Sequence, residues 1–125
     1  MILVVEDNED LLDVLRWVLE SARYTVATAA NGEDALVCIR AAPRPRLVLL
    51  DITLPDMSGL EVAARMKADP ALAEIPIVLV SGMPFIQTGG IPMLLKPVAP
   101  DDLLVAVRRY AGRASELSEI EHLPP

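Results

Sequence analysis

Three acidic side chains stand at the carboxyl ends of short apolar runs in this sequence. Asp51 closes the run 47–50, and Glu6 and Asp7 follow the run 2–5. Short apolar runs of this kind are consistent with buried strands of a parallel sheet. Residues at the carboxyl ends of such strands face the crevice in which these folds bind ligands. The three carboxylates are therefore candidates for a nucleophile and for metal ligands.

A hydroxyl and an ammonium group complete this set of candidate residues. Ser81 follows the apolar run 77–80, and Lys96, which precedes Pro97, ends a further run. A carboxylate is a competent nucleophile toward phosphorus, and phosphoryl transfer is catalysed mostly by positioning and charge neutralisation. Magnesium prefers oxygen ligands and is typically held by one or two carboxylates together with phosphate. The combination therefore predicts a magnesium-assisted phosphoryl site.

Taken together, and in this order along the chain, these residues resemble the receiver domain of two-component response regulators. An acidic pair or a Lys-Pro dipeptide occurs anywhere by chance, but the full set, each member at the end of a strand pattern, is a strong signal. The resemblance covers roughly residues 1–112. The motifs that carry it are Glu6-Asp7, Asp51, the turn Leu54-Pro55-Asp56-Met57-Ser58-Gly59, Ser81-Gly82 and Lys96-Pro97.

The resemblance implies a role for each of these side chains. Asp51 would be the phosphoacceptor, Lys96 would pair with one phosphoryl oxygen, and Ser81 would hydrogen-bond another. Gly82 after the hydroxyl is small enough to leave an acyl phosphate reachable. Clustered carboxylates should also have raised pKa values, which favours a bound cation. The implied ligands of Mg²⁺ are Glu6, Asp7, Asp51 and the backbone carbonyl of Thr53.

The resemblance also implies partners. The phosphodonor would be a sensor histidine kinase or a histidine phosphotransfer protein, and the output would be binding of an unknown downstream effector. Similar receivers dock on the kinase through the first helix and the loop after Lys-Pro, which here offer Leu11, Val14, Trp17 and Pro97. Trp17 falls on the polar side of that helix, and tryptophan is enriched in binding hot spots. Partial burial of Trp17 against a neighbouring loop is the competing expectation.

Two other functions compete with a phosphorylated receiver. A phosphatase of the haloacid dehalogenase type also uses an aspartate nucleophile, but it needs a second acid two residues later, where this chain has Thr53. A degenerate receiver would act as an interaction module without phosphorylation. The intact acidic pair, Ser81 and Lys96 argue against degeneracy, whereas the unusual segment after Ser81 keeps it open. The expected class is a signalling switch and not an enzyme with an external substrate.

The elements that must position these residues follow from the alternation of strand and helix patterns, which is typical of βαβ units with a parallel sheet. Right-handed crossovers then place helices on both faces. The resemblance implies a doubly wound, flavodoxin-like α/β fold with strand order 2-1-3-4-5. We expect strands near 2–6, 24–28, 46–51, 76–81 and 93–95, helices near 8–22, 32–41, 59–68 and 101–112, and a polar, acidic tail or linker over 113–125.

The segment between Ser81 and Lys96 departs from the family pattern. Receivers usually place a full fourth helix and a fifth strand there, but residues 82–92 include three Gly and two Pro. These are the poorest helix formers, so the sequence predicts a truncated or missing fourth helix. Met93 occupies the position at which receivers commonly carry an aromatic switch residue. Gly82, Met83 and Met93 are therefore the candidate switch segment.

Composition supports a single domain with an aliphatic core. Of 125 residues, 53% are apolar but only 3% are aromatic, and the net charge is −7. This charge argues against direct binding of nucleic acid or anionic lipid. Cys38, the only cysteine, excludes an internal disulfide, fits a reducing compartment, and is expected to be a small buried hydrophobe. No apolar run approaches membrane-spanning length, so a cytoplasmic protein without membrane contact is expected.

Overall fold

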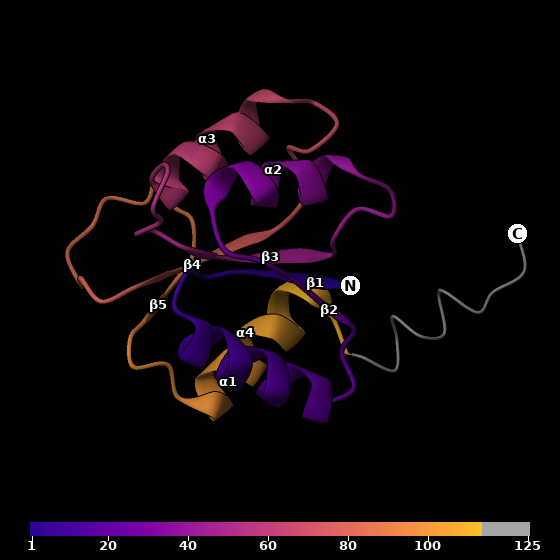
Figure 1. Ribbon diagram of the computed structural model, residues 1–125, viewed down its shortest axis with the longest axis vertical. Helices are drawn as coiled ribbons and strands as arrows, with labels where there is room; N and C mark the ends of the chain where they lie inside the picture. Colours follow the sequence, from indigo (N-terminus) through magenta and orange to yellow (C-terminus); the bar gives the residue numbers. More distant parts are fainter. Residues whose placement is uncertain (114–125) are drawn as a thin grey trace, which may run out of the picture.

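Five parallel strands form one sheet in the order β2-β1-β3-β4-β5 within residues 1–113, the part of the chain that the computed structural model describes. Four helices join these strands (Figure 1). In chain order the elements are β1 (Ile2–Val5), α1 (Glu9–Ser21), β2 (Val26–Ala29), α2 (Gly32–Arg40), β3 (Leu47–Asp51), α3 (Gly59–Ala68), β4 (Ile77–Ser81), β5 (Met93–Leu95) and α4 (Pro100–Ala111). The predicted doubly wound α/β fold and its strand order are confirmed.

Helices cover both faces of the sheet. Figure 1 shows α2 and α3 on one face and α1 and α4 on the other. Side chains of successive strand residues point to opposite faces, so Val48 and Leu50 of β3 pack with α2 and α3, whereas Leu47 and Leu49 pack with α1 and α4. The strand is therefore buried on both sides, which is why its sequence is an unbroken apolar run.

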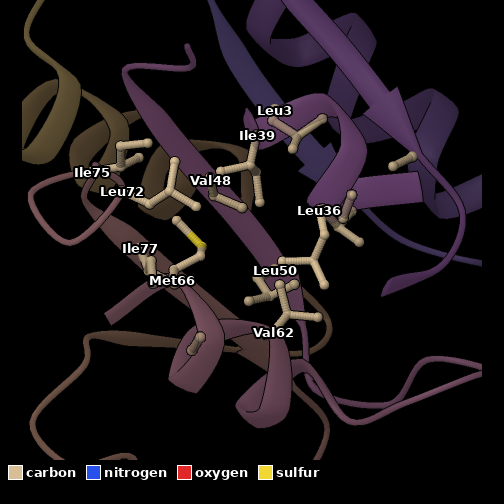
Figure 2. Packing of buried hydrophobic residues seen from close by; sticks show 14 of the residues in the cluster. Leu3, Leu36, Ile39, Val48, Leu50, Val62, Met66, Leu72, Ile75 and Ile77 are labelled. Carbon is tan, nitrogen blue, oxygen red and sulfur yellow. The ribbon is translucent and has the colours of Figure 1, made fainter. Parts of the chain in front are cut away.

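The core on the α2–α3 face is almost wholly aliphatic. Figure 2 shows the side chains of α2 and α3 interleaved with those of the sheet. The core residues labelled in Figure 2 are all buried: Leu3, Leu36, Ile39, Val48, Leu50, Val62, Met66, Leu72, Ile75 and Ile77. This agrees with the low aromatic content of the sequence. A close-packed core of this kind holds the strand ends, and hence the candidate site, in fixed relative positions.

Three of the four helices begin with a side-chain cap of the kind that Asn and Ser commonly provide. The side chains of Asn8, Asn31 and Ser58 each accept a backbone N–H from the first turn of α1, α2 and α3. Helix α4 begins after Ala99, which makes no side-chain cap, and Pro100 occupies its first turn instead. Proline suits that position because its missing N–H would have no partner within the helix.

The connection between β4 and β5 contains no helix, which confirms the predicted loss of the fourth helix. Ile86 and Ile91 are partly buried and pack against the core on the α2–α3 side. Phe85 is 97% exposed. Gly89 and Gly90 have φ angles of 65° and 89°, a conformation that other residues rarely adopt. The sequence of this segment therefore specifies a loop.

Two smaller expectations turned out differently. Trp17 is 71% exposed, so its expected partial burial against a neighbouring loop was wrong. Cys38 is partly buried at the margin of the α2–α3 core and not fully inside it. Except for Arg113, the predicted tail 113–125 lies outside the described residues. Within residues 1–113, no helix has the length and apolar character needed to cross a lipid bilayer.

Candidate functional site

The carboxyl ends of β1, β3, β4 and β5 meet at one edge of the sheet. Asp51 is aligned with Val80 in the parallel register, one residue before Ser81 ends β4. The backbone N–H of Lys96 donates to the Ser81 carbonyl over 2.8 Å, which continues the pairing of β4 and β5 by one residue. Glu6 follows β1 directly. The strand pairing thus brings together the residues that the sequence pattern singled out.

The three predicted carboxylates form one cluster. Glu6, Asp7 and Asp51 each place a carboxylate oxygen within 4.8 Å of the other two. Glu6 and Asp51 are almost fully buried, with 2% and 3% of their surface exposed, whereas Asp7 is open to solvent. Hard divalent cations prefer such oxygen donors. The exposed member gives an ion access to the two buried carboxylates.

Lys96 lies between the two buried carboxylates. Its Nζ donates a hydrogen bond to Asp51 Oδ2 over 3.0 Å. The same atom lies 2.9 Å from Glu6 Oε1, with which it forms an ion pair. One ammonium group therefore faces two buried carboxylates, which leaves the cluster with an excess of negative charge.

Burial and the neighbouring charges together perturb proton binding at the site. Burial, followed by the neighbouring Asp51 carboxylate, raises the pKa of Glu6 to about 7, although Lys96 and the N–H of Asn8 act in the opposite direction. The sequence-based expectation attributed raised carboxylate pKa values to clustering, but for Glu6 burial is the larger cause. Burial also tends to lower the pKa of Lys96, yet its contacts with Glu6 and Asp51 raise the pKa above the ordinary value.

The donor set fits a small divalent cation. Glu6 Oε1 is buried and shares the Lys96 ammonium, 2.9 Å away, with Asp51, so one positive charge faces two buried carboxylates. A divalent ion among the three carboxylates would offset their charge. Thr53 is placed nearby because its N–H donates to Asp51 Oδ1 over 3.1 Å. Glu6, Asp7, Asp51 and the Thr53 carbonyl are therefore suitable candidate ligands.

Ser81 is held by its own turn. The hydroxyl oxygen accepts the N–H of Met83 over 3.0 Å, and it lies 3.5 Å from the Met83 carbonyl, to which it can donate. Ser81 is 2% exposed, whereas Gly82 and Met83 are exposed. A Cβ at Gly82 would meet no atom within 4 Å. The rim beside the hydroxyl is thus open to solvent.

The predicted docking residues are mostly exposed, whereas the predicted switch residue Met93 is partly buried. Val14 and Trp17 of α1 are 53% and 71% exposed, Leu11 is partly buried, and Pro97 is exposed in the β5–α4 connection. Met93 is partly buried and contacts the α2–α3 core. Helices α1 and α4 lie together on one face of the sheet (Figure 1). The exposed side chains of Val14 and Trp17 are accessible to a partner.

Asp56 is a further polar residue near the site, and its contacts were not predicted from the sequence. Its two carboxylate oxygens accept the backbone N–H groups of Gly32 and Glu33 over 2.8 and 2.9 Å. Asp56 thereby ties the β3–α3 loop to the first turn of α2. The turn motif 54–59 marked this loop, but the partners lie more than 20 residues away in the chain, where no local pattern could find them.

Comparisons with known proteins identify the family of this chain. A family model described as the response regulator receiver domain matches residues 2–108. The polar-differentiation response regulator DivK of Brucella anthropi is 33% identical over 120 residues, covering 90% of this chain and 97% of that protein. These matches span nearly the whole described chain.

Solved structures show the same fold. The receiver domain of NtrX from Brucella abortus superposes with a TM-score of 0.78 at 31% identity, covering 89% of this chain and 98% of the other. A CheY-like receiver domain protein from Methanospirillum hungatei has a TM-score of 0.77 at 28% identity, with 96% and 94% covered. The chain belongs to the response regulator receiver domain family.

Proposed function

We propose that this receiver accepts a phosphoryl group on Asp51 from the phosphohistidine of a sensor histidine kinase or a histidine phosphotransfer protein. The observation that carries the proposal is the buried Asp51 carboxylate, clustered with Glu6 and Asp7 and bound by Lys96. A structural ion pair would need only one carboxylate for one lysine. Two extra acids at the same edge of the sheet are consistent with a site that holds a metal and a phosphoryl group together.

The chain's own residues supply the steps of this transfer. Asp51 attacks phosphorus through a carboxylate oxygen, and the bond between phosphorus and the donor nitrogen breaks as the new bond to oxygen forms. Lys96, already 3.0 Å from Asp51 Oδ2, neutralises charge on a phosphoryl oxygen. The Ser81 hydroxyl donates a hydrogen bond to another phosphoryl oxygen and gives up its contact with the Met83 carbonyl.

Mg²⁺ would be held by Glu6, Asp7, Asp51 and the Thr53 carbonyl, and it would supply charge neutralisation at the phosphoryl oxygens. The same residues would serve hydrolysis of the Asp51 acyl phosphate, in which water attacks phosphorus, the bond from phosphorus to the Asp51 oxygen breaks, and inorganic phosphate and the free carboxylate are formed. Self-catalysed phosphotransfer and autodephosphorylation are then the only chemistry, so the domain is a signalling switch and not an enzyme with an external substrate.

The rival functions have less support in the site. A haloacid dehalogenase-type phosphatase needs a general acid two residues after its nucleophile, and Thr53 carries none. A degenerate receiver would have no use for a buried Glu6 carboxylate clustered with Asp7 and Asp51 around one lysine. The loop that replaces the fourth helix favours degeneracy, but it leaves all of the acceptor residues in place.

The proposal also covers the switch segment, the bounds of the domain and the location of the protein. Phosphorylation would change the segment that includes Gly82, Met83 and Met93, and a downstream effector would read that change. Residues 1–112 would form the receiver, and residues 113–125 a tail or linker. The protein would act in the cytoplasm, where sensor kinases present their phosphohistidine. It would bind neither nucleic acid nor membrane by this domain.

The test is phosphorylation with a small donor. The protein is incubated with acetyl phosphate or phosphoramidate and Mg²⁺, and its intact mass is measured. We expect one phosphoryl adduct on the wild type, none on Asp51→Asn, and strongly reduced labelling on Lys96→Ala. A wild type that stays unlabelled, or an adduct that persists in Asp51→Asn, would refute the assignment.

A further inference from the structure

The β3–α3 loop, residues 52–58, is closed at its base. Thr53 and Ser58 form an antiparallel bridge, and the N–H of Gly59 donates to the Ile52 carbonyl over 2.8 Å. A Cβ at Gly59 would overlap the carbonyl oxygen of Asp51, so the start of α3 lies directly against the acceptor residue. The position of this loop and the position of Asp51 are therefore coupled.

The tip of the same loop is attached to α2. Asp56 accepts two N–H groups from the first turn of α2, at Gly32 and Glu33. The Met57 side chain lies against Gly32, where a Cβ would overlap it. These contacts join the loop to a helix that contributes no side chain to the acceptor site.

A carboxylate is well suited to this attachment. The first N–H groups of a helix have no partner within the helix, and the positive end of the helix dipole favours an anion. The N–H groups of Gly32 and Glu33 hold the pKa of Asp56 below its ordinary value. Asn31 caps the same helix from within, by accepting the N–H of Asp34 over 2.8 Å. Helix α2 thus has a local cap and a second cap that comes from the loop.

We propose that Asp56 is a positioning residue of the acceptor site, which holds loop 52–58 against α2 so that the Thr53 carbonyl stays in place to bind the divalent cation. This inference rests on the proposed function. Residues that hold a metal ligand from outside the coordination sphere typically change metal affinity by 10- to 100-fold when they are replaced. Asp56 lies three positions from Thr53 and accepts two hydrogen bonds from the first turn of α2, so it is placed for that role.

Asp56→Ala and Asn31→Ala are the test variant and its matched control. Each substitution removes a side chain that accepts N–H groups from the first turn of α2, but only Asp56 connects that turn to the loop. Mg²⁺ alone is titrated into the full chain, and its affinity is read from backbone amide shifts. We expect affinity about 10-fold weaker in Asp56→Ala, unchanged affinity in Asn31→Ala, and an intermediate value in Asp56→Asn, which keeps one acceptor oxygen.

A second measurement follows the attachment itself. Hydrogen exchange of the Gly32 and Glu33 amides should be faster in Asp56→Ala than in the wild type. Equal Mg²⁺ affinity in Asp56→Ala and wild type, or equal weakening by Asn31→Ala, overturns the positioning role, because α2 stability alone would then explain the result. A wild type that binds no Mg²⁺ and takes no phosphoryl group overturns the proposed function instead. Weak binding confined to Asp56→Ala and Asp56→Asn supports the inference.

Discussion

Glu6 carries a carboxylate into surroundings that oppose its charge. Its pKa is raised from 4.5 to about 7, first by burial and then by Asp51. Because the folded-state pKa lies above the unfolded value, proton binding stabilises the fold. This contribution is fully present below pH 4.5 and is lost as the pH rises through about 7. The metal-free protein should therefore lose stability between these two values.

We predict that the free energy of unfolding, measured by urea denaturation without metal, is lower at pH 8 than at pH 5 by roughly 1–3 kcal/mol from this group. Glu6→Gln should remove most of that difference, because an amide does not titrate. Added Mg²⁺ should restore stability at pH 8, since the ion binds the ionised carboxylates. A pH dependence that is identical in Glu6→Gln and wild type would contradict this account.

Gly59 and Gly82 form a matched pair of glycines beside the site. A Cβ at Gly59 would overlap the Asp51 backbone, whereas a Cβ at Gly82 would meet nothing within 4 Å. We predict that Gly59→Ala lowers the free energy of unfolding by about 1–3 kcal/mol through overpacking. This is opposite to the usual effect in a helix, where alanine is more favourable than glycine. Gly82→Ala should change stability by less than about 0.5 kcal/mol. Similar denaturation midpoints for the two variants would contradict the close approach of α3 to Asp51.

At the scale of elements, the segment between β4 and β5 takes the place of a helix. Its ends are anchored by Ser81, whose hydroxyl bonds the Met83 N–H, and by Lys96, whose N–H bonds the Ser81 carbonyl. Three glycines raise the entropic cost of ordering the stretch between them. Phosphate contacts made by Ser81 and Lys96 would restrain both ends and bias the segment toward order.

We predict that amides in residues 82–92 exchange quickly in the free protein and become protected when beryllofluoride, a phosphoryl mimic, binds with Mg²⁺. Ser81→Ala should weaken the added protection, because it removes the contact between the phosphoryl group and the turn at Met83. Hydrogen exchange followed by mass spectrometry measures both states. Protection that is already complete without the mimic, or that does not change with it, would show that output leaves through another part of the domain.

The sequence predicted the elements well where burial alone decides them. Strands β1, β3 and β4 are buried at every position, so their apolar runs are unambiguous. The edge strand β2 was expected at 24–28 but spans 26–29, because a half-exposed strand lacks such a run. The missing helix was also predictable, since glycine and proline act locally.

The candidate site was predictable in its members but not in its contacts. Acid, hydroxyl and lysine at strand ends are visible in the chain, and parallel pairing must bring them together. The bridge from Lys96 to Glu6 and Asp51 depends on side-chain geometry. The attachment of Asp56 to α2 joins residues more than 20 positions apart. Neither the contacts of Lys96 nor those of Asp56 produce a pattern of composition or periodicity that can be recognised in the sequence.

At the scale of the whole molecule, the two helical layers have different relations to the site. The α2–α3 layer is tied to it through Asp56 and Gly59. The α1–α4 layer is connected to the site through the backbone. Helix α1 begins shortly after Glu6 and Asp7, and α4 begins shortly after Lys96 and Pro97. A kinase that docks on α1 could therefore reach Asp51 without contacting α2 or α3.

Trp17 and Val37 allow this division to be tested. Both are large exposed apolar side chains, 71% and 67% exposed, but Trp17 lies on α1 and Val37 on α2. We predict that Trp17→Ala slows phosphotransfer from a histidine kinase or phosphotransfer protein that labels the wild type, by about 10- to 30-fold, as expected for loss of a hot-spot tryptophan. Val37→Ala should transfer at the wild-type rate.

Neither substitution should alter labelling by acetyl phosphate, because a small donor needs the acceptor site but no docking surface. Comparing the two donors therefore separates docking from chemistry. Equal slowing by Trp17→Ala and Val37→Ala would place the docking surface elsewhere. Slowing of Trp17→Ala with both donors would show that Trp17 acts on the site through the fold. Only a loss confined to the protein donor and to Trp17 agrees with docking on the α1 face, which leaves the loop 82–92 and the α2–α3 layer free to contact an effector.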